Sequence, residues 1–112
     1  MKTHKYKATK TVIDGITFDS KKEADYSKKL ALLLKAGKIK DLSRQVAFCW
    51  IEKHSHDGKE IDFKRRYVAD FVYYDVTLKK TIIVDVKGFK TTEYKKKKKI
   101  VEKIFEIKIT EV

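Results

Sequence analysis

The seven residues from 81 to 87, Thr-Ile-Ile-Val-Asp-Val-Lys, constrain the fold more than any other part of the chain. In an extended strand, successive side chains point to opposite faces, so this segment carries apolar residues on both faces. Such a strand needs cover on both sides and belongs in the centre of a sheet. Asp85 and Lys87 interrupt it on one shared face. A buried carboxylate without a partner costs several kcal/mol or takes up a proton, so this polar pair requires a reason.

Residues 59–75 predict a second long strand, in which apolar residues recur at the odd positions from Ile61 to Tyr73 except at Arg65. The other face becomes apolar near Asp70. If this strand is the antiparallel neighbour of residues 81–87, the short turn through residues 77–80 brings Asp70 close to Asp85. The apolar odd positions are Ile61, Phe63, Tyr67, Ala69, Phe71 and Tyr73.

Two helices are predicted from their caps and spacing. Ser20-Lys21-Lys22-Glu23 is a capping box, and Gly37 suits the left-handed position after a helix end. Apolar residues recur between them at helical intervals. A second, lysine-rich helix begins at Thr91 or Thr92 and runs through about Ile104.

The remaining segments complete an α/β (α+β) fold. Residues 13–16 form a turn between short extended pieces, residues 46–53 a strand, and residues 54–58 a hairpin turn. Alternation over residues 105–110 predicts a last strand. The core order is therefore helix, three strands, helix, strand. Residues 1–11 are a flexible basic arm of one domain spanning residues 1–112.

Charge favours nucleic acid as the partner. The chain has 28 basic and 16 acidic residues, a net charge of +12, and such a surface attracts polyanions. The single cysteine, Cys49, excludes an internal disulfide and is expected to be a small buried side chain in a reduced compartment. No segment is apolar enough for a membrane span or an export signal, so a cytoplasmic protein is expected.

Asp70 and Asp85 together are typical of a cation site. Clustered carboxylates repel each other unless a cation joins them, and oxygen ligands favour Mg²⁺ or Mn²⁺ over zinc. The alternative is structural: Asp85 pairs with Lys87 or with a lysine from a helix, and Asp70 lies at the sheet margin.

The spacing of these residues resembles a known signature. Asp70, fourteen intervening residues and then Asp85-Val86-Lys87-Gly88 resemble the PD-(D/E)xK nuclease superfamily, although Ala69 replaces the proline and Asp85 uses the less common acidic option. More narrowly, the chain resembles a phage-encoded domain family of unknown function, often described as similar to Holliday-junction resolvases. The segments that carry this narrower resemblance are residues 21–24, 39–42, 67–71 and 84–90.

The resemblance implies a restriction-endonuclease-like core of order α-β-β-β-α-β, with a mixed central sheet flanked by helices. It implies that Asp70, Asp85 and the main-chain carbonyl of Val86 bind Mg²⁺ or Mn²⁺, and that Glu23 binds it directly or through water. Lys87 would orient the attacking water or help to deprotonate it. The catalytic set is thus Glu23, Asp70, Asp85 and Lys87.

Several candidate residues have two interpretations. Glu23 either completes the capping box or faces the site, since it lies on the apolar stripe of its helix. Gln45 resembles a glutamine near the site of related nucleases, but glutamines are common where strands begin. The run of lysines at residues 95–99 forms a solvated face or contacts phosphates. Proposed DNA contacts are Gln45, Lys90, Lys95 and Lys98, whereas His54 and His56 are expected to be exposed and to bind no zinc.

These observations lead to two main hypotheses. The first is a metal-dependent endodeoxyribonuclease, with branched or Holliday-junction DNA as one candidate substrate and a homodimer as a candidate assembly, because junction resolution needs paired incisions. The second is a non-catalytic DNA-binding module that keeps the nuclease fold. A protein inhibitor or assembly factor is disfavoured by the intact Asp-Asp-Lys set.

Overall fold

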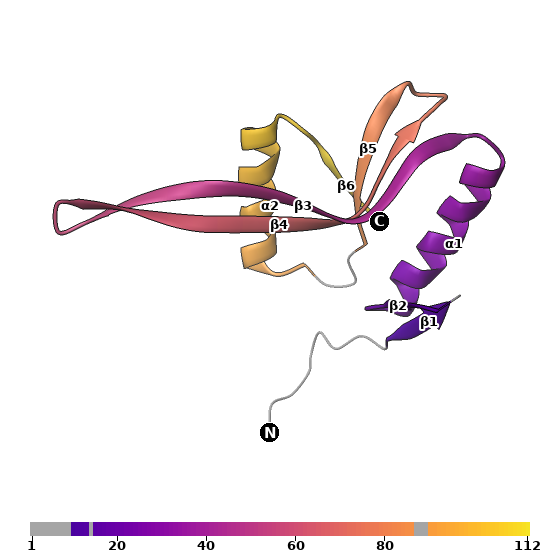
Figure 1. Ribbon diagram of the computed structural model, residues 1–112, viewed down its shortest axis with the longest axis horizontal. Helices are drawn as coiled ribbons and strands as arrows, with labels where there is room; N and C mark the ends of the chain where they lie inside the picture. The colour runs from indigo at the N-terminus through magenta and orange to yellow at the C-terminus, as the bar shows by residue number, and fades with distance from the viewer. Residues whose placement is uncertain (1–9, 14, 87–89) are drawn as a thin grey trace.

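The computed structural model describes residues 10–13, 15–86 and 90–112. Over these residues the chain forms a mixed α/β fold with two helices, a four-stranded mixed sheet and a small antiparallel two-stranded sheet (Figure 1). The α+β class predicted from the sequence is thus confirmed. In chain order the elements are β1 (Thr11–Ile13), β2 (Ile16–Phe18), α1 (Lys21–Lys35), β3 (Ile39–His56), β4 (Lys59–Asp75), β5 (Lys80–Asp85), α2 (Thr92–Phe105) and β6 (Ile109–Glu111).

The four strands of the main sheet lie in the order β3-β4-β5-β6. The first three are antiparallel, whereas β6 runs parallel to β5 after the chain crosses over through α2. The register of β4 and β5 ends with Phe71 opposite Val84, so Asp70 and Asp85 follow at the point where the two strands part. The antiparallel pairing that was predicted to bring these two aspartates together is therefore present.

Strand β5 is covered on both faces, as its sequence predicted. Val84 is fully buried in one core cluster and Ile83, 6% exposed, in another. The first cluster contains Phe18, Ala24, Leu30, Ile39, Phe71, Tyr73, Val84 and Val86. The second contains Tyr67, Ala69, Ile83, Val101 and Ile109.

Both helices begin and end near the predicted residues. The Ser20 hydroxyl accepts a hydrogen bond from the Glu23 N–H at 3.1 Å, and Thr91 caps α2 in the same way through the Tyr94 N–H at 3.0 Å. Gly37 has φ of 75°, the left-handed conformation that glycine adopts most easily.

The bounds of β3 and of the last strand differ from the prediction. Strand β3 continues to His56, into the residues predicted as the hairpin turn. Strand β3 begins at Ile39 instead of residue 46, because Ile39 is buried against α1 and a bulge after Lys40 lets the strand continue. The last strand is only Ile109–Glu111, because α2 extends through Phe105, whose half-buried ring packs against Phe48 of β3.

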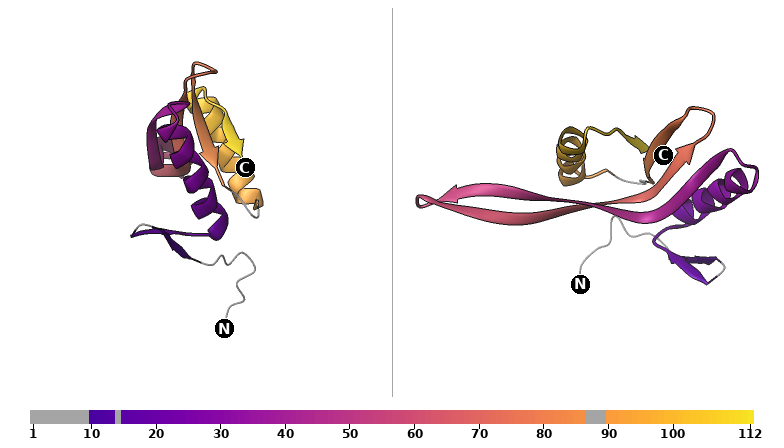
Figure 2. Two further views of the ribbon diagram at one scale, coloured as in Figure 1. Left: turned by 90° about the vertical axis from the view of Figure 1, so that its right-hand side faces the viewer. Right: turned by 45° about the horizontal axis from the view of Figure 1, so that its top comes forward.

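The hairpin of β3 and β4 extends well beyond the rest of the molecule (Figures 1 and 2). We call its outer part, residues 49–66, the arm. No other described element covers its tip, so Ile61 and Phe63 are each 40% exposed despite their apolar alternation. Cys49 is also exposed, which corrects the expectation that it is buried.

Candidate active site

Asp70 and Asp85 meet where β4 and β5 separate. Asp85 is fully buried, and the Tyr67 hydroxyl donates a hydrogen bond to its Oδ2. Asp70 is partly exposed, and its Oδ2 accepts a 2.7 Å hydrogen bond from the Val86 N–H. The backbone that follows Asp85 is therefore held directly against the Asp70 carboxylate.

Glu23 approaches this pair from the first turn of α1. It is only 3% exposed, and its carboxylate faces β3. There its Oε2 accepts a hydrogen bond from Gln45 Nε2 at 3.1 Å and lies 3.5 Å from Arg44 Nη2. The backbone N–H of Glu23 bonds to the Ser20 hydroxyl, which is one half of a capping box. Its carboxylate does not complete the box but bonds to Gln45, which also lies 3.4 Å from Asp70 Oδ1.

Gln45 links the helix glutamate to the strand aspartate. Its Nε2 lies 3.1 Å from Glu23 Oε2 and 3.4 Å from Asp70 Oδ1. Gln45 has φ of 52°, an uncommon left-handed conformation for a residue in a strand. Gln45 of β3 thus joins the acidic side chains of α1 and β4.

The electrostatics of Asp70 reflect this crowding. The pKa of its carboxyl group is raised from 3.8 to about 7, mainly by burial and then by the neighbouring Asp85 and Glu23. The hydrogen bond from the Val86 N–H acts in the opposite direction. Burial and Asp85 likewise raise the pKa of Tyr67, so its hydroxyl stays protonated and able to donate.

The predicted DNA-contacting lysines divide into two groups. The ammonium nitrogens of Lys90 and Lys98 lie 3.1 and 3.5 Å from carboxylate oxygens of Glu111. Both lysines therefore form ion pairs at the end of β6, next to Asp85 of β5. Lys95 is exposed on α2. Lys87, the predicted catalytic lysine, lies outside the described residues.

A hollow of about 480 Å³ adjoins the Tyr67 side of the cluster. Arg66 of β4 and Lys97 of α2 contribute positive charge to it. Its full lining is Arg66, Tyr67, Val68, Thr91, Glu93, Tyr94 and Lys97.

The carboxylates do not form a preorganised metal-binding site in this structure. Within residues 10–13, 15–86 and 90–112, no three histidine, cysteine or acidic side chains are grouped closely enough to hold a metal ion. Instead, Tyr67 and Gln45 bond to the carboxylate oxygens. His54 and His56 are exposed on the arm beside Glu52 and Asp57, as the sequence predicted.

Two residues of the network were not identified from the sequence. Tyr67 precedes Asp70 by three residues, so alternation alone places it on the opposite face. Arg44 lies outside the strand predicted over residues 46–53. The available signal was that both lie next to predicted site residues, Tyr67 in the motif of Asp70 and Arg44 beside Gln45.

The fold and this cluster define a mixed α/β domain with a buried acidic site at the end of its central strands. Residues 3–112 match the family model described as "Protein of unknown function (DUF1064)", so the chain belongs to that family. Comparison with curated proteins and with solved structures gives no significant match. No helix among the described residues is long and apolar enough to cross a bilayer.

Proposed function

We propose that this protein is a metal-dependent endodeoxyribonuclease that hydrolyses DNA phosphodiester bonds at the Glu23, Asp70 and Asp85 cluster. The observation that carries the proposal is the convergence of three acidic side chains from three different elements, two of them almost fully buried. Burying like charges together destabilises a fold, and a divalent cation is the usual reason that such a cluster is retained.

The donor chemistry of the cluster fits Mg²⁺ or Mn²⁺. Asp70, Asp85 and the Val86 carbonyl would hold the ion, with Glu23 binding directly or through water. Such an ion supplies an activated water and neutralises charge on the scissile phosphate. Asp70 would bind the ion as a carboxylate and so would release its proton. Tyr67 and Gln45 would orient the carboxylates of Asp85 and Glu23, because a ligating carboxylate oxygen can also accept a hydrogen bond.

Charge outside the cluster supports DNA as the substrate. The chain carries a net charge of +12, and Lys90, Lys95 and Lys98 lie on or beside α2, which follows the central strand. Such side chains would bind phosphates without reading sequence. Gln45 would position Glu23 and Asp70 and could also contact DNA from its exposed place on β3.

The resemblance to PD-(D/E)xK nucleases also supports the proposal. The order α1, β3, β4, β5, α2, β6 agrees with the order that the resemblance implies. On that resemblance, Lys87 would orient or help to deprotonate the attacking water. A bacterial cytoplasm is the proposed compartment, and branched DNA such as a Holliday junction is the proposed substrate structure.

The test is a cleavage assay with purified protein, Mg²⁺ or Mn²⁺, and supercoiled, linear and four-way-junction DNA. We expect cutting that is abolished by EDTA, by Asp85→Asn and by Lys87→Ala. The control Lys28→Glu alters an exposed lysine on α1 and should cut like wild type. If wild type binds DNA without cutting it, and Asp85→Asn binds equally well, the protein is a DNA-binding module and the nuclease proposal is wrong.

A further inference from the structure

The arm is an unusual structure for a protein of this size. A two-stranded ribbon alone in water is at best marginally stable, and three or more strands are normally needed. Beyond the body, the arm consists of β3 and β4 alone, because β5 pairs with β4 only from Phe71 onward among the described residues. From Lys59 to Arg66, no described strand pairs with the edge of β4 that faces away from β3, so this edge is open to another strand.

The arm also differs from the rest of the chain in charge. It carries five basic and four acidic residues, a net charge of +1, so the remaining residues carry +11 of the total +12. This mixture suits another protein surface better than DNA. The charged residues are Glu52, Lys53, Asp57, Lys59, Glu60, Asp62, Lys64, Arg65 and Arg66.

We propose that the arms of two copies of this chain pair through the open edges of β4, antiparallel and about a two-fold axis at Phe63. In such an isologous interface each residue meets its symmetry partner. Phe63 then faces Phe63 of the second copy, Asp62 faces Lys64, and Glu60 faces Arg66. These two charged pairs lie on the face opposite Phe63, and both are opposite in sign. The hairpin of β3 and β4 becomes one half of a four-stranded sheet.

Moving the two-fold axis by one residue along β4 places like charges opposite each other. An axis at Asp62 places Asp62 opposite itself and Lys59 opposite Arg65. An axis at Lys64 places Lys64 opposite itself. Like charges directly opposite each other destabilise a strand pair, so the axis at Phe63 is favoured.

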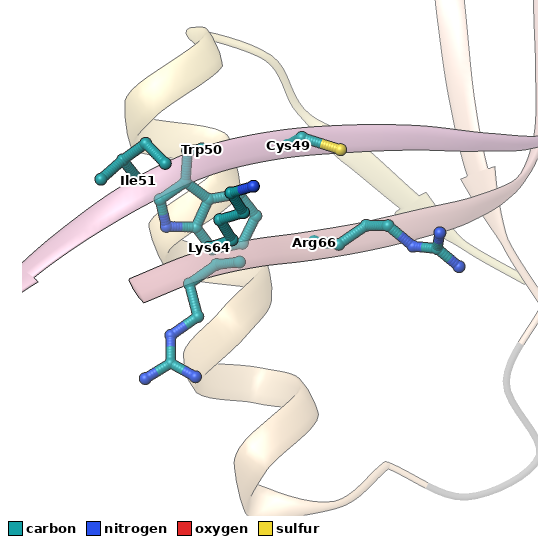
Figure 3. Close-up of a pocket in the computed structure, with 6 residues that line it drawn as sticks. Cys49, Trp50, Ile51, Lys64 and Arg66 are labelled. Carbon is teal, nitrogen blue, oxygen red and sulfur yellow. The ribbon is translucent and has the colours of Figure 1, made fainter. Parts of the chain in front are cut away.

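The exposed side chains of the arm fit the same assembly. Phe63, with the His54 ring 5.0 Å away, is 40% exposed and would pack against its symmetry mate. The opposite face holds an apolar hollow of about 390 Å³ where Cys49 and Ile51 of β3 lie beside Lys64 and Arg66 of β4 (Figure 3). The inference concerns assembly and stands whether or not the protein is a nuclease.

Charge reversal at Lys64 tests the register. Wild type should have twice the 13.2 kDa chain mass by light scattering at micromolar concentration. Lys64→Glu places two like-charge pairs in the interface and should raise the dimer Kd about tenfold or more. The double variant Asp62→Lys/Lys64→Glu restores opposite charges and should restore the dimer. The control Lys28→Glu makes the same charge change on α1 and should remain dimeric.

Cross-linking tests the position of the axis. On a Cys49→Ser background, a short bismaleimide should join two copies of Phe63→Cys. It should not join two copies of Glu52→Cys, because Glu52 lies opposite Phe63 on the outer strand, three strand spacings or about 14 Å from its symmetry mate. A monomeric wild type, a double variant that stays monomeric while circular dichroism shows it folded, or equal cross-linking at both positions would overturn the proposal.

Discussion

Replacing Asp70 with asparagine should stabilise the folded protein at pH 8. The folded state raises the pKa of Asp70 from 3.8 to about 7, mainly through burial and then through Asp85. The unfolded chain therefore ionises near pH 4, whereas the folded chain keeps the proton until about pH 7. The free energy of unfolding falls as the pH rises through this window and stays low above it.

The expected gain in the free energy of unfolding follows from the difference between the folded and unfolded pKa of Asp70. Each pH unit corresponds to about 1.4 kcal/mol, so the pKa change sets an upper limit of about 4 kcal/mol. Asp70 is partly exposed, and solvent screening reduces this to an expected gain of about 1–2 kcal/mol. Asparagine can still accept the Val86 N–H bond.

The assay is urea unfolding in EDTA at pH 5 and pH 8, followed by circular dichroism. Asp70→Asn should gain stability at pH 8 and clearly less at pH 5, where wild type still holds its proton. Asp25→Asn removes a carboxylate from the exposed side of α1 and should change stability by less than about 0.5 kcal/mol at both pH values. Equal gains at the two pH values, or no gain at pH 8, would refute the reasoning.

Three further predictions concern the supports of the site and the arm. Ser20→Ala removes the acceptor of the Glu23 N–H and should lower the free energy of unfolding by about 1 kcal/mol in urea; an unchanged midpoint would contradict the cap. Tyr67→Phe removes the hydroxyl that bonds to buried Asp85 and should cost about 1–3 kcal/mol in the same assay, so a variant as stable as wild type would count against that bond. Phe105→Ala removes the ring whose centroid lies 5.3 Å from Phe48 and 6.4 Å from Trp50; it should cost about 2–3 kcal/mol and shift Trp50 fluorescence to the red, and unchanged emission would show that α2 does not cover the arm base.

Local signals in the sequence predicted the elements that depend on local chemistry. Ser20 and Thr91 cap their helices because a hydroxyl can accept the free N–H groups of a first turn wherever the helix lies. The two-sided apolar pattern around Val84 likewise required a covered strand. Asp70 and Asp85 were identified because a carboxylate in such strands is costly in any fold.

Features that depend on the length of an element or on its neighbours were not predicted. Cys49 and Phe63 lie in apolar patterns that indicate burial. Both are exposed, because the hairpin of β3 and β4 extends past the helices that could cover it. The bonding of Tyr67 to Asp85 depends on how β4 and β5 separate, which alternation does not encode. The positive φ of Gln45 also arises from tertiary structure, since glutamine has no local preference for it.

The central claim is that Glu23, Asp70 and Asp85 form one cation site, and calorimetric titration with Mn²⁺ tests it most directly. At pH 8 we expect one ion bound per chain by wild type and by Asp25→Asn, with weaker binding at pH 6 because Asp70 must release its proton. Asp85→Asn should bind Mn²⁺ at least tenfold more weakly than wild type, because the variant lacks one charged ligand. If wild type binds no Mn²⁺, or if Asp85→Asn binds it as tightly as wild type does, the three carboxylates do not form that site.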